Sequence, residues 1–204
     1  MINNTVKIVN DLLNTNTYIY TLNNKKCFII DPGSDFTSIQ NYITNNFLQP
    51  IAIFLTHGHF DHIASAAILK KNYNCKLYIH KNDIKIAQLS NFLLKIFGFN
   101  NQIEIPIFDF LIEKSYLELE IEKKKITYTN LQGHTKGSCI IQIDDILFTG
   151  DIILKTSDNS KIPNENPKEL KISQNFILNK YSNFYIYPGH GQSGYISNFK
   201  DILK

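Results

Sequence analysis

His57-Gly58-His59-Phe60-Asp61-His62 gathers three histidines and an aspartate within six residues. An apolar run over 51–56 precedes it and a segment of helical character follows it, so histidines and a carboxylate occupy a turn between a strand and a helix. Imidazole and carboxylate groups together suit a borderline divalent metal ion, with zinc first and iron or manganese as alternatives. His57 and His59 can reach one ion from the same side, which leaves Asp61 and His62 to hold another.

Length and composition predict a globular enzyme with a sizeable hydrophobic core. The chain has 204 residues, of which 43% are hydrophobic and 19% are charged, so we expect a single domain over 1–204. The N-terminus has no basic start followed by an apolar stretch, and no apolar run approaches the roughly 20 residues of a membrane helix. We therefore expect a cytoplasmic protein without a membrane partner, as a monomer or small homo-oligomer. The cysteines lie far apart beside apolar runs and are predicted to be buried free thiols: Cys27, Cys75 and Cys139.

The positive charge of the chain is small and scattered. The formal net charge is +3, and all 21 basic residues are lysine. The densest cluster, Lys123-Lys124-Lys125, is interpreted as a solvated hairpin turn, so we expect no nucleic-acid partner. Without arginine, no guanidinium fork is available to clamp a carboxylate or phosphate through two parallel hydrogen bonds.

Strand and helix signals come in two successive sets, each mostly strands first and helices afterwards. The first set predicts strands over 6–8, 16–22, 27–30, 51–56 (after Pro50) and 76–79, and helices over 36–48, 63–72 and 83–90. The second set predicts strands over 116–121, 126–130, 139–143, 146–149 and 184–187, helices over 167–181 and near 197–203, and a surface loop over 152–166. Two sheets packed face to face with helices outside would bury these runs. The apolar segment 91–99 fits either plain core or a hydrophobic lid beside an active site.

Three further polar residues share one local context. His134, Asp151 and His190 each stand just past an apolar strand and next to glycine, which allows the tight turn of a metal loop. Taken singly, each is more often a turn or capping residue. With the first cluster they make seven candidate ligands, five histidines and two aspartates, which is enough for two ions with positions left for water and substrate.

The chain resembles the metallo-β-lactamase superfamily and, within it, the short glyoxalase II-like hydrolases. The resemblance covers essentially the whole length and is carried by motifs in the family's order: Asn16-Thr17-Tyr18, Asp31-Pro32-Gly33, Thr56 to His62, Gly133-His134-Thr135, Phe148-Thr149-Gly150-Asp151 and Pro188-Gly189-His190-Gly191. It implies an α/β fold, a four-layer αββα sandwich with two metal ions at one edge of the sheets. It also implies which residues surround each ion: His57, His59 and His134 the first, Asp61, His62 and His190 the second, and Asp151 both.

The activity that this resemblance implies is metal-dependent hydrolysis of a small S-acyl thioester, such as S-lactoylglutathione, by a thioesterase of the glyoxalase II type. A water shared by two ions loses a proton near neutral pH and becomes the nucleophile, and Asp61 would both ligate and orient it. Asp31 fits two roles, a support of the metal loops from outside the ligand set or a helix cap. His80 is predicted to be a strand-end or core histidine and not a ligand.

Departures from the family pattern concern substrate recognition. Members of this type commonly carry a Gly-Arg segment after the bridging aspartate, whereas residues 155–160 contain no arginine, and Lys136 stands where proline is usual. No counterpart of the helical extension that binds glutathione in full-length glyoxalase II follows His190. Other reactions on the same centre stay open: lactone or phosphodiester hydrolysis, or persulfide dioxygenation at a single iron. A non-catalytic metal-binding module would need a defect in the ligand set, and the sequence has none.

Overall fold

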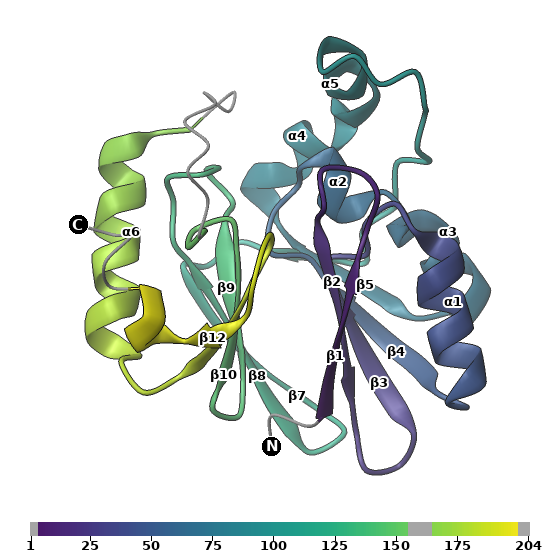
Figure 1. Ribbon diagram of the computed structural model, residues 1–204, viewed down its shortest axis with the longest axis horizontal. Coiled ribbons are helices and arrows are strands. Elements are labelled where there is room, and N and C mark those ends of the chain that lie inside the picture. The colour runs from purple at the N-terminus through teal and green to yellow at the C-terminus, as the bar shows by residue number, and fades with distance from the viewer. Residues whose placement is uncertain (1–3, 155–164, 200–204) are drawn as a thin grey trace.

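Two sheets packed face to face form the centre of the computed structural model, which describes residues 4–154 and 165–199 (Figure 1). The strands of the first sheet follow the order β1 (Thr5–Val9), β2 (Asn16–Thr21), β3 (Lys26–Ile30), β4 (Gln49–Phe54), β5 (Lys76–His80) and β6 (Phe110–Ile112). Those of the second sheet follow the order β12 (Gly194–Tyr195), β11 (Tyr185–Pro188), β10 (Ile146–Gly150), β9 (Cys139–Ile143), β8 (Lys124–Asn130) and β7 (Tyr116–Ile121).

Helices cover the outer face of each sheet, which gives the four-layer αββα arrangement that the sequence predicted (Figure 1). α1 (Phe36–Asn45) and α3 (Ala66–Tyr73) lie against the first sheet, and α6 (Pro167–Lys180) lies against the second. The shorter helical elements are α2 (Phe60–Ile63), η2 (Lys81–Asp83), α4 (Ile84–Gln88), α5 (Ser90–Ile96) and η3 (Ile196–Phe199). Buried apolar side chains fill the space between each helical layer and its sheet.

Parallel pairing brings the C-terminal ends of several strands to one edge of the sandwich. β3, β4, β5 and β6 pair in parallel in the first sheet, and β10 pairs in parallel with β11 in the second. Residues that directly follow these strands therefore gather at that edge. Asp31 follows β3, and Asp151 follows β10. Polar residues from distant parts of the sequence thus lie close together at this common edge, which we call the seam between the sheets.

Aromatic side chains from both sheets interlock in the space between them. Phe54 of β4 is fully buried, and its ring centroid lies 5.2 Å from that of Phe28, 5.1 Å from that of Tyr78 and 6.0 Å from that of Tyr128. Tyr128 belongs to the second sheet, so this contact joins the two halves. Such tilted and edge-to-face pairs add to the stabilisation that burial alone provides.

Several predictions of local structure are confirmed. All three cysteines are free and buried. The helix predicted over 36–48 begins at Phe36 as α1, and Asp35 caps it, since the Asp35 side chain accepts a hydrogen bond from the Ser38 backbone N–H at 3.0 Å. Glu122 and Lys123 both have positive φ in the turn between β7 and β8, which is the pattern of a tight two-residue hairpin turn. The lysine cluster at this turn therefore belongs to a hairpin, as predicted.

Other boundaries differ from the prediction for physical reasons. Pro50 lies inside β4 and not before it, at the point where the pairing with β3 is irregular, because a proline cannot donate a ladder hydrogen bond there. The predicted helix over 63–72 is two elements, and the first begins at Phe60, inside the histidine motif. The predicted helix over 83–90 covers the last residue of η2, all of α4 and the first residue of α5. The short strands β6 and β12 have too few residues to show a periodic pattern.

The apolar segment 91–99 is not plain core. It contains most of α5, in which Phe92 and Ile96 are 61% and 60% exposed while Leu94 is buried. Phe97, just after the helix, packs on Phe60 of α2 with ring centroids 5.7 Å apart. The segment therefore lies against the histidine motif with part of its apolar surface uncovered, and its role as a lid stays a prediction.

Parts of two predictions lie outside the described residues, namely most of the loop over 152–166 and most of the helix near 197–203. Where the structure describes the second segment, it is the 3-10 helix η3. No helix in the described part of the chain has the length and apolar character needed to cross a membrane.

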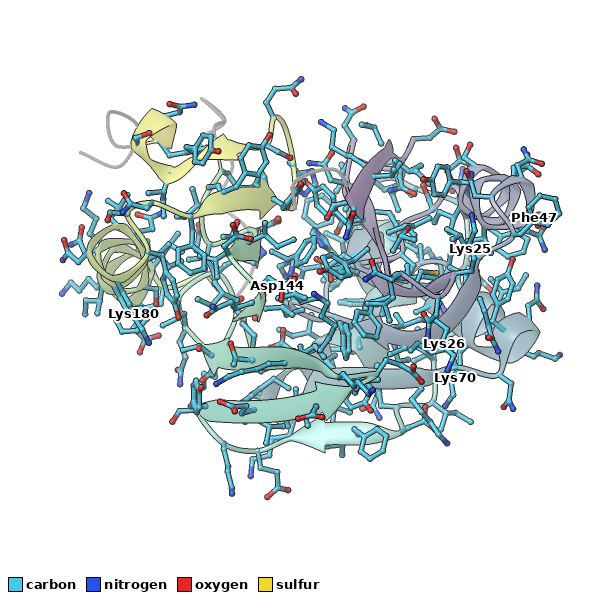
Figure 2. All side chains as sticks on the ribbon, turned by 90° about the horizontal axis from the view of Figure 1, so that it is seen from below. Lys25, Lys26, Phe47, Lys70, Asp144 and Lys180 are labelled. Atoms are coloured by element: carbon cyan, nitrogen blue, oxygen red, sulfur yellow. The ribbon has the colours of Figure 1, made fainter. Side chains whose placement is uncertain are left out.

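Truncating the aromatic contact between the sheets tests this account of the core. Phe54→Ala removes a fully buried ring that contacts both sheets and should lower the free energy of unfolding by about 3–5 kcal/mol, as measured by denaturant titration. Phe47→Ala is the matched control because Phe47 lies on the outside of the molecule with 83% of its surface exposed (Figure 2). Its effect should stay within about 0.5 kcal/mol. Equal losses for the two variants would contradict this description of the core.

Candidate metal centre

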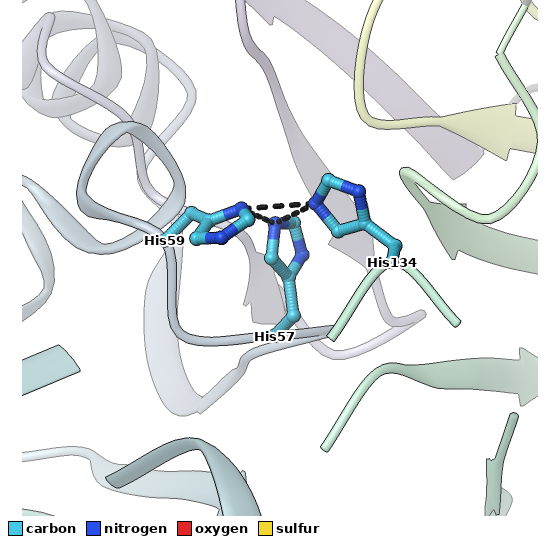
Figure 3. A group of neighbouring side chains, drawn as sticks. All are labelled: His57, His59 and His134. Atoms are coloured by element: carbon cyan, nitrogen blue, oxygen red, sulfur yellow. Dashed lines mark hydrogen bonds between the residues drawn. The ribbon is translucent and has the colours of Figure 1, made fainter. Parts of the chain in front are cut away.

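Three histidine nitrogens converge on one point at the seam between the sheets (Figure 3). His134 Nε2 lies 2.9 Å from His59 Nδ1 and 3.2 Å from His57 Nε2, and His57 Nε2 lies 3.1 Å from His59 Nδ1. The nitrogens of a tetrahedral zinc site, with Zn–N bonds of about 2.0–2.1 Å, stand roughly 3.3 Å apart. This group, which we call the three-histidine site, therefore has the spacing that a metal ion requires.

A second group of possible ligands lies beside the first. His62 Nε2 and His190 Nε2 lie 3.5 Å and 3.4 Å from Asp61 Oδ2. Asp61 and His62 come from the short helix α2, and His190 comes from the loop after β11. These three residues could hold a metal ion. We call them the Asp-His-His site.

Asp151 stands between the two groups. Its Oδ2 lies 3.5 Å from His134 Nε2 of the first group and 3.3 Å from His190 Nε2 of the second. Its Oδ1 lies 3.4 Å from His62 Nε2. The structure thus brings together all seven residues that the sequence singled out, in the grouping that the resemblance implied.

Three buried polar atoms of this cluster have no hydrogen-bond partner among the described residues, namely His62 Nε2, Asp151 Oδ1 and His134 Nδ1. Buried polar atoms are normally paired, because leaving one unpaired costs about 1–3 kcal/mol. His134 faces the other histidines with its Nε2 atom, so its Nδ1 atom is not the candidate ligand. His62 Nε2 and Asp151 Oδ1 lie 3.4 Å apart among the candidate ligands, so a bound cation would satisfy them. The residues therefore fit a metal ion.

The protonation states of the three-histidine site favour metal binding. Burial lowers the pKa of His57, His59 and His134, and that of His134 falls to about 4. The three imidazoles are therefore neutral near pH 7. A neutral imidazole is the form that offers a nitrogen lone pair to a metal.

In the Asp-His-His site, carboxylates and histidines hold one another in their charged forms. Burial opposes a charge on His190, but the Asp151 carboxylate outweighs it and raises the pKa of His190 to about 10. Burial and the neighbouring carboxylates compete in the same way at His62, whose pKa is raised. Burial also opposes the charge on Asp61, yet His62 and His190 lower the pKa of that carboxyl to about 2. Both histidines are therefore protonated near pH 7 when no metal ion is bound, and a divalent cation would replace their protons between the carboxylates.

Asp31 supports ligands of both groups and does not cap a helix. Its Oδ1 accepts a hydrogen bond from the Thr56 backbone N–H at 2.8 Å, and its Oδ2 lies 2.5 Å from Thr56 Oγ1 and 3.0 Å from His62 Nδ1. Thr56 Oγ1 in turn lies 3.0 Å from His57 Nδ1. Through Thr56 and His62, Asp31 thus fixes the orientation of two candidate ligands. These contacts occupy the Nδ1 atoms of His57 and His62, so the Nε2 atoms of both rings remain free to bind an ion.

Sequence reasoning missed the residues of the β1–β2 turn that hold the Asp-His-His site. Thr15 Oγ1 donates to Asp61 Oδ2 at 2.5 Å, and the Leu13 carbonyl lies 3.0 Å from His190 Nδ1. Asn16 Nδ2, at the start of β2, donates to the carbonyl of Pro188, which ends β11 just before His190, at 2.9 Å. No spacing rule relates this turn to residues that are 46 and 177 positions away along the chain. Its adjacency to the Asn16-Thr17-Tyr18 motif was the available signal.

His80 is a strand-end histidine, as predicted. It is buried at the end of β5, and its Nδ1 accepts a hydrogen bond from the Asn82 backbone N–H at 3.3 Å.

Known proteins resemble this chain in sequence and in fold. Residues 10–204 match the sequence model of the Metallo-beta-lactamase superfamily. A probable metallo-hydrolase of Bacillus subtilis, YqgX, is 30% identical over 147 residues, which cover 70% of this chain and 68% of that protein. A hydroxyacylglutathione hydrolase of Wigglesworthia glossinidia brevipalpis is 33% identical over 150 residues, which cover 72% of this chain and 51% of that protein.

Solved structures extend the likeness to nearly the full length. The B3 metallo-beta-lactamase BLEG-1 has a TM-score of 0.82 at 24% identity and covers 97% of this chain and 96% of its own. TTHA1623, solved in a di-iron-bound form, has a TM-score of 0.81 at 22% identity and covers 94% of this chain and 95% of its own. At these identities the likeness shows the fold alone.

Removing the carboxylate charge of Asp31 tests whether Asp31 orients ligands of both the three-histidine site and the Asp-His-His site. Asp31→Asn replaces one acceptor oxygen with an amide that cannot accept from Thr56 or His62, so binding at both sites should weaken by about 10–100-fold. Competition with a chromogenic chelator measures the two affinities for Zn²⁺. Asp35→Asn is the control because it changes a carboxylate that caps α1, and it should leave both affinities unchanged. Wild-type affinities in Asp31→Asn would show that its contacts do not orient the ligands.

Proposed function

Because the chain belongs to the metallo-beta-lactamase superfamily, we propose that it is a metal-dependent hydrolase that uses two divalent ions to cleave a small S-acyl thioester. The observation that carries this proposal is the position of Asp151. Its carboxylate faces His57 and His134 on one side and His62 and His190 on the other, at 3.3–3.9 Å. A carboxylate between two complete ligand groups is what a two-ion centre requires.

Each residue has a defined task in such a centre. His57, His59 and His134 would hold the first ion, the Asp-His-His site would hold the second, and Asp151 would contact both. When bound, two divalent ions lower the pKa of a water between them toward neutrality and polarise a carbonyl group that is attacked. Zinc suits the mixed nitrogen and oxygen donors, and iron or manganese suits them as well. The di-iron form of TTHA1623 supports iron as an alternative in this fold.

Asp61 is the residue proposed to orient the attacking water. Its low pKa keeps the carboxyl ionised at neutral pH, so it accepts hydrogen bonds and does not donate them. The hydroxyl of Thr15 fixes its Oδ2 from the outer side. Asp61 therefore combines a fixed position with the correct protonation state for holding a water in line with an acyl carbon.

A thioester is the substrate class that this set of groups supports best. A thiolate is a good leaving group, since a free thiol has a pKa of about 8.5, and it can depart without a dedicated general acid. The likeness to the hydroxyacylglutathione hydrolase supports the same class. That likeness spans about half of the relative's length, so the thiol part of the substrate is not carried over from it. With no arginine in the chain, lysines and backbone N–H groups would bind an anionic substrate.

A substrate panel tests the proposed activity. Zn²⁺-loaded protein should hydrolyse S-lactoylglutathione or another small S-acyl thioester at least 100 times faster than it hydrolyses a lactone, a phosphodiester or a β-lactam, in assays that follow thiol release or ring opening. Hydrolysis of one of those other substrates in preference to all thioesters would replace the thioesterase proposal.

Asp61→Ala tests the task of the proposed water-orienting residue. The turnover number should fall on the order of 10²–10⁴-fold, while the circular dichroism spectrum stays unchanged. Asp145→Ala is the matched control because Asp145 is an exposed carboxylate at the β9–β10 turn, at the opposite end of the strand that leads to Asp151. It should keep full activity. If Asp61→Ala also kept full activity, Asp61 would have no part in the reaction.

A further inference from the structure

One buried carboxylate outside the candidate ligand set has no place in the function proposed so far. Asp83 ends η2, is fully buried, and accepts three hydrogen bonds within the described part of the chain. Its Oδ2 accepts from the Gly58 N–H at 2.8 Å and from Thr135 Oγ1 at 2.7 Å, and its Oδ1 accepts from the Gly137 N–H at 2.7 Å. Burial of a carboxylate is costly unless such donors compensate it.

The three donors belong to the two loops that carry the three-histidine site. Gly58 stands between His57 and His59, and Thr135 directly follows His134. These loops are more than 70 residues apart in sequence, and they come from different sheets. A single carboxylate therefore ties the loop of His57 and His59 to the loop of His134.

The glycines on either side of Asp83 make this approach possible. A Cβ atom on Gly58 would lie 2.6 Å from the Asp83 carbonyl oxygen, and one on Gly137 would lie 2.4 Å from Asp83 Oδ1. Both distances are shorter than any ordinary contact, so a side chain at either position would push the carboxylate away from its donors. Gly58, Asp83 and Gly137 thus form one packing unit.

We propose that Asp83 is a positioning residue for the three-histidine site, which sets the separation of its two loops and thereby the affinity of the first ion. The inference rests on the proposed two-ion centre. The Asp-His-His site has other supports, Thr15 for Asp61, Asp31 for His62 and Leu13 for His190. Loss of Asp83 should therefore weaken one site and spare the other. A ligand nitrogen must be held within about 0.5 Å of its metal-binding position. A residue that positions the ligand loops can therefore change the metal affinity without contacting the metal.

The test is a Co²⁺ titration of metal-free protein, followed by visible absorption, because Co²⁺ reports the coordination of each site. Asp83→Asn keeps the size of the side chain but leaves one donor facing an amide N–H₂ group. Its affinity for Co²⁺ at the three-histidine site should fall about 10–100-fold, while the affinity at the Asp-His-His site stays unchanged. Thr15→Val, which removes the hydroxyl that supports Asp61, should instead weaken Co²⁺ binding at the Asp-His-His site.

Reference variants identify which site is lost. His134→Ala gives the absorption of protein that lacks the three-histidine site, and His190→Ala gives that of protein that lacks the Asp-His-His site. At one equivalent of Co²⁺, the Asp83→Asn spectrum should match the His134→Ala spectrum. Asp109→Asn is the control, since Asp109 also accepts from a backbone N–H, that of Leu77 at 2.9 Å, while its ion-pair partners are Lys70 and Lys76 and not the candidate ligands. It should titrate like the wild type.

The titration separates failure of the two-ion centre from failure of the positioning role of Asp83. Wild-type protein that binds no Co²⁺ would overturn the proposed two-ion centre itself. Wild-type protein with two sites, together with an Asp83→Asn variant of unchanged affinity and spectrum, would overturn the positioning role alone. If Asp83→Asn does not fold, Thr135→Val removes one of the three donors, and Thr135→Ser keeps it. The valine variant should lose affinity at the first site and the serine variant should regain it, and equal affinities would contradict the proposal.

Discussion

Two carboxylates, those of Asp61 and Asp151, are buried where the edges of the two sheets meet, and the surrounding residues are arranged to compensate their charge. Burying an unpaired carboxylate is among the most unfavourable steps in folding, so a fold that keeps two of them together must bring positive charge to the same place. Five histidines surround the pair, and three of them are neutral because burial lowers their pKa values. The other two, His62 and His190, have raised pKa values beside the carboxylates, so in the absence of a metal ion their protons carry the compensating charge, and a bound cation would replace those protons.

The topology explains how the candidate ligands reach this point from four separate segments, which are 57–62 and the loops of His134, Asp151 and His190. Parallel pairing places the ends of β3 and β4 in one sheet and of β10 and β11 in the other at a common edge. Behind this edge, buried side chains that are not candidate ligands fix the rings and loops. Asp31 contacts His62 directly and His57 through Thr56, and so supports both groups, whereas Thr15 contacts only the Asp-His-His site, at Asp61 and through a bridge to His190. Part of the support is thus common to both sites and part is specific to one.

Most of the fold and all seven candidate ligands could be predicted from the sequence, because strand periodicity and the polar residues at strand ends are local signals. The start of α2 inside the histidine motif, the position of Pro50 within β4 and the short edge strands could not, since they depend on pairing between distant segments. The sequence allows two roles for Asp31, and its hydrogen bonds to Thr56 and His62 show that it supports the ligands. Thr15 and Asp83 carry no sequence signal of their own, because their partners lie far away along the chain.

Anomalous X-ray diffraction from crystals grown with Zn²⁺ is the direct test of a two-ion centre bridged by Asp151. Two anomalous peaks should appear about 3.5–4 Å apart, one among His57, His59 and His134 and the other among Asp61, His62 and His190, with the Asp151 carboxylate in contact with both. A single peak, or peaks away from these residues, would contradict it.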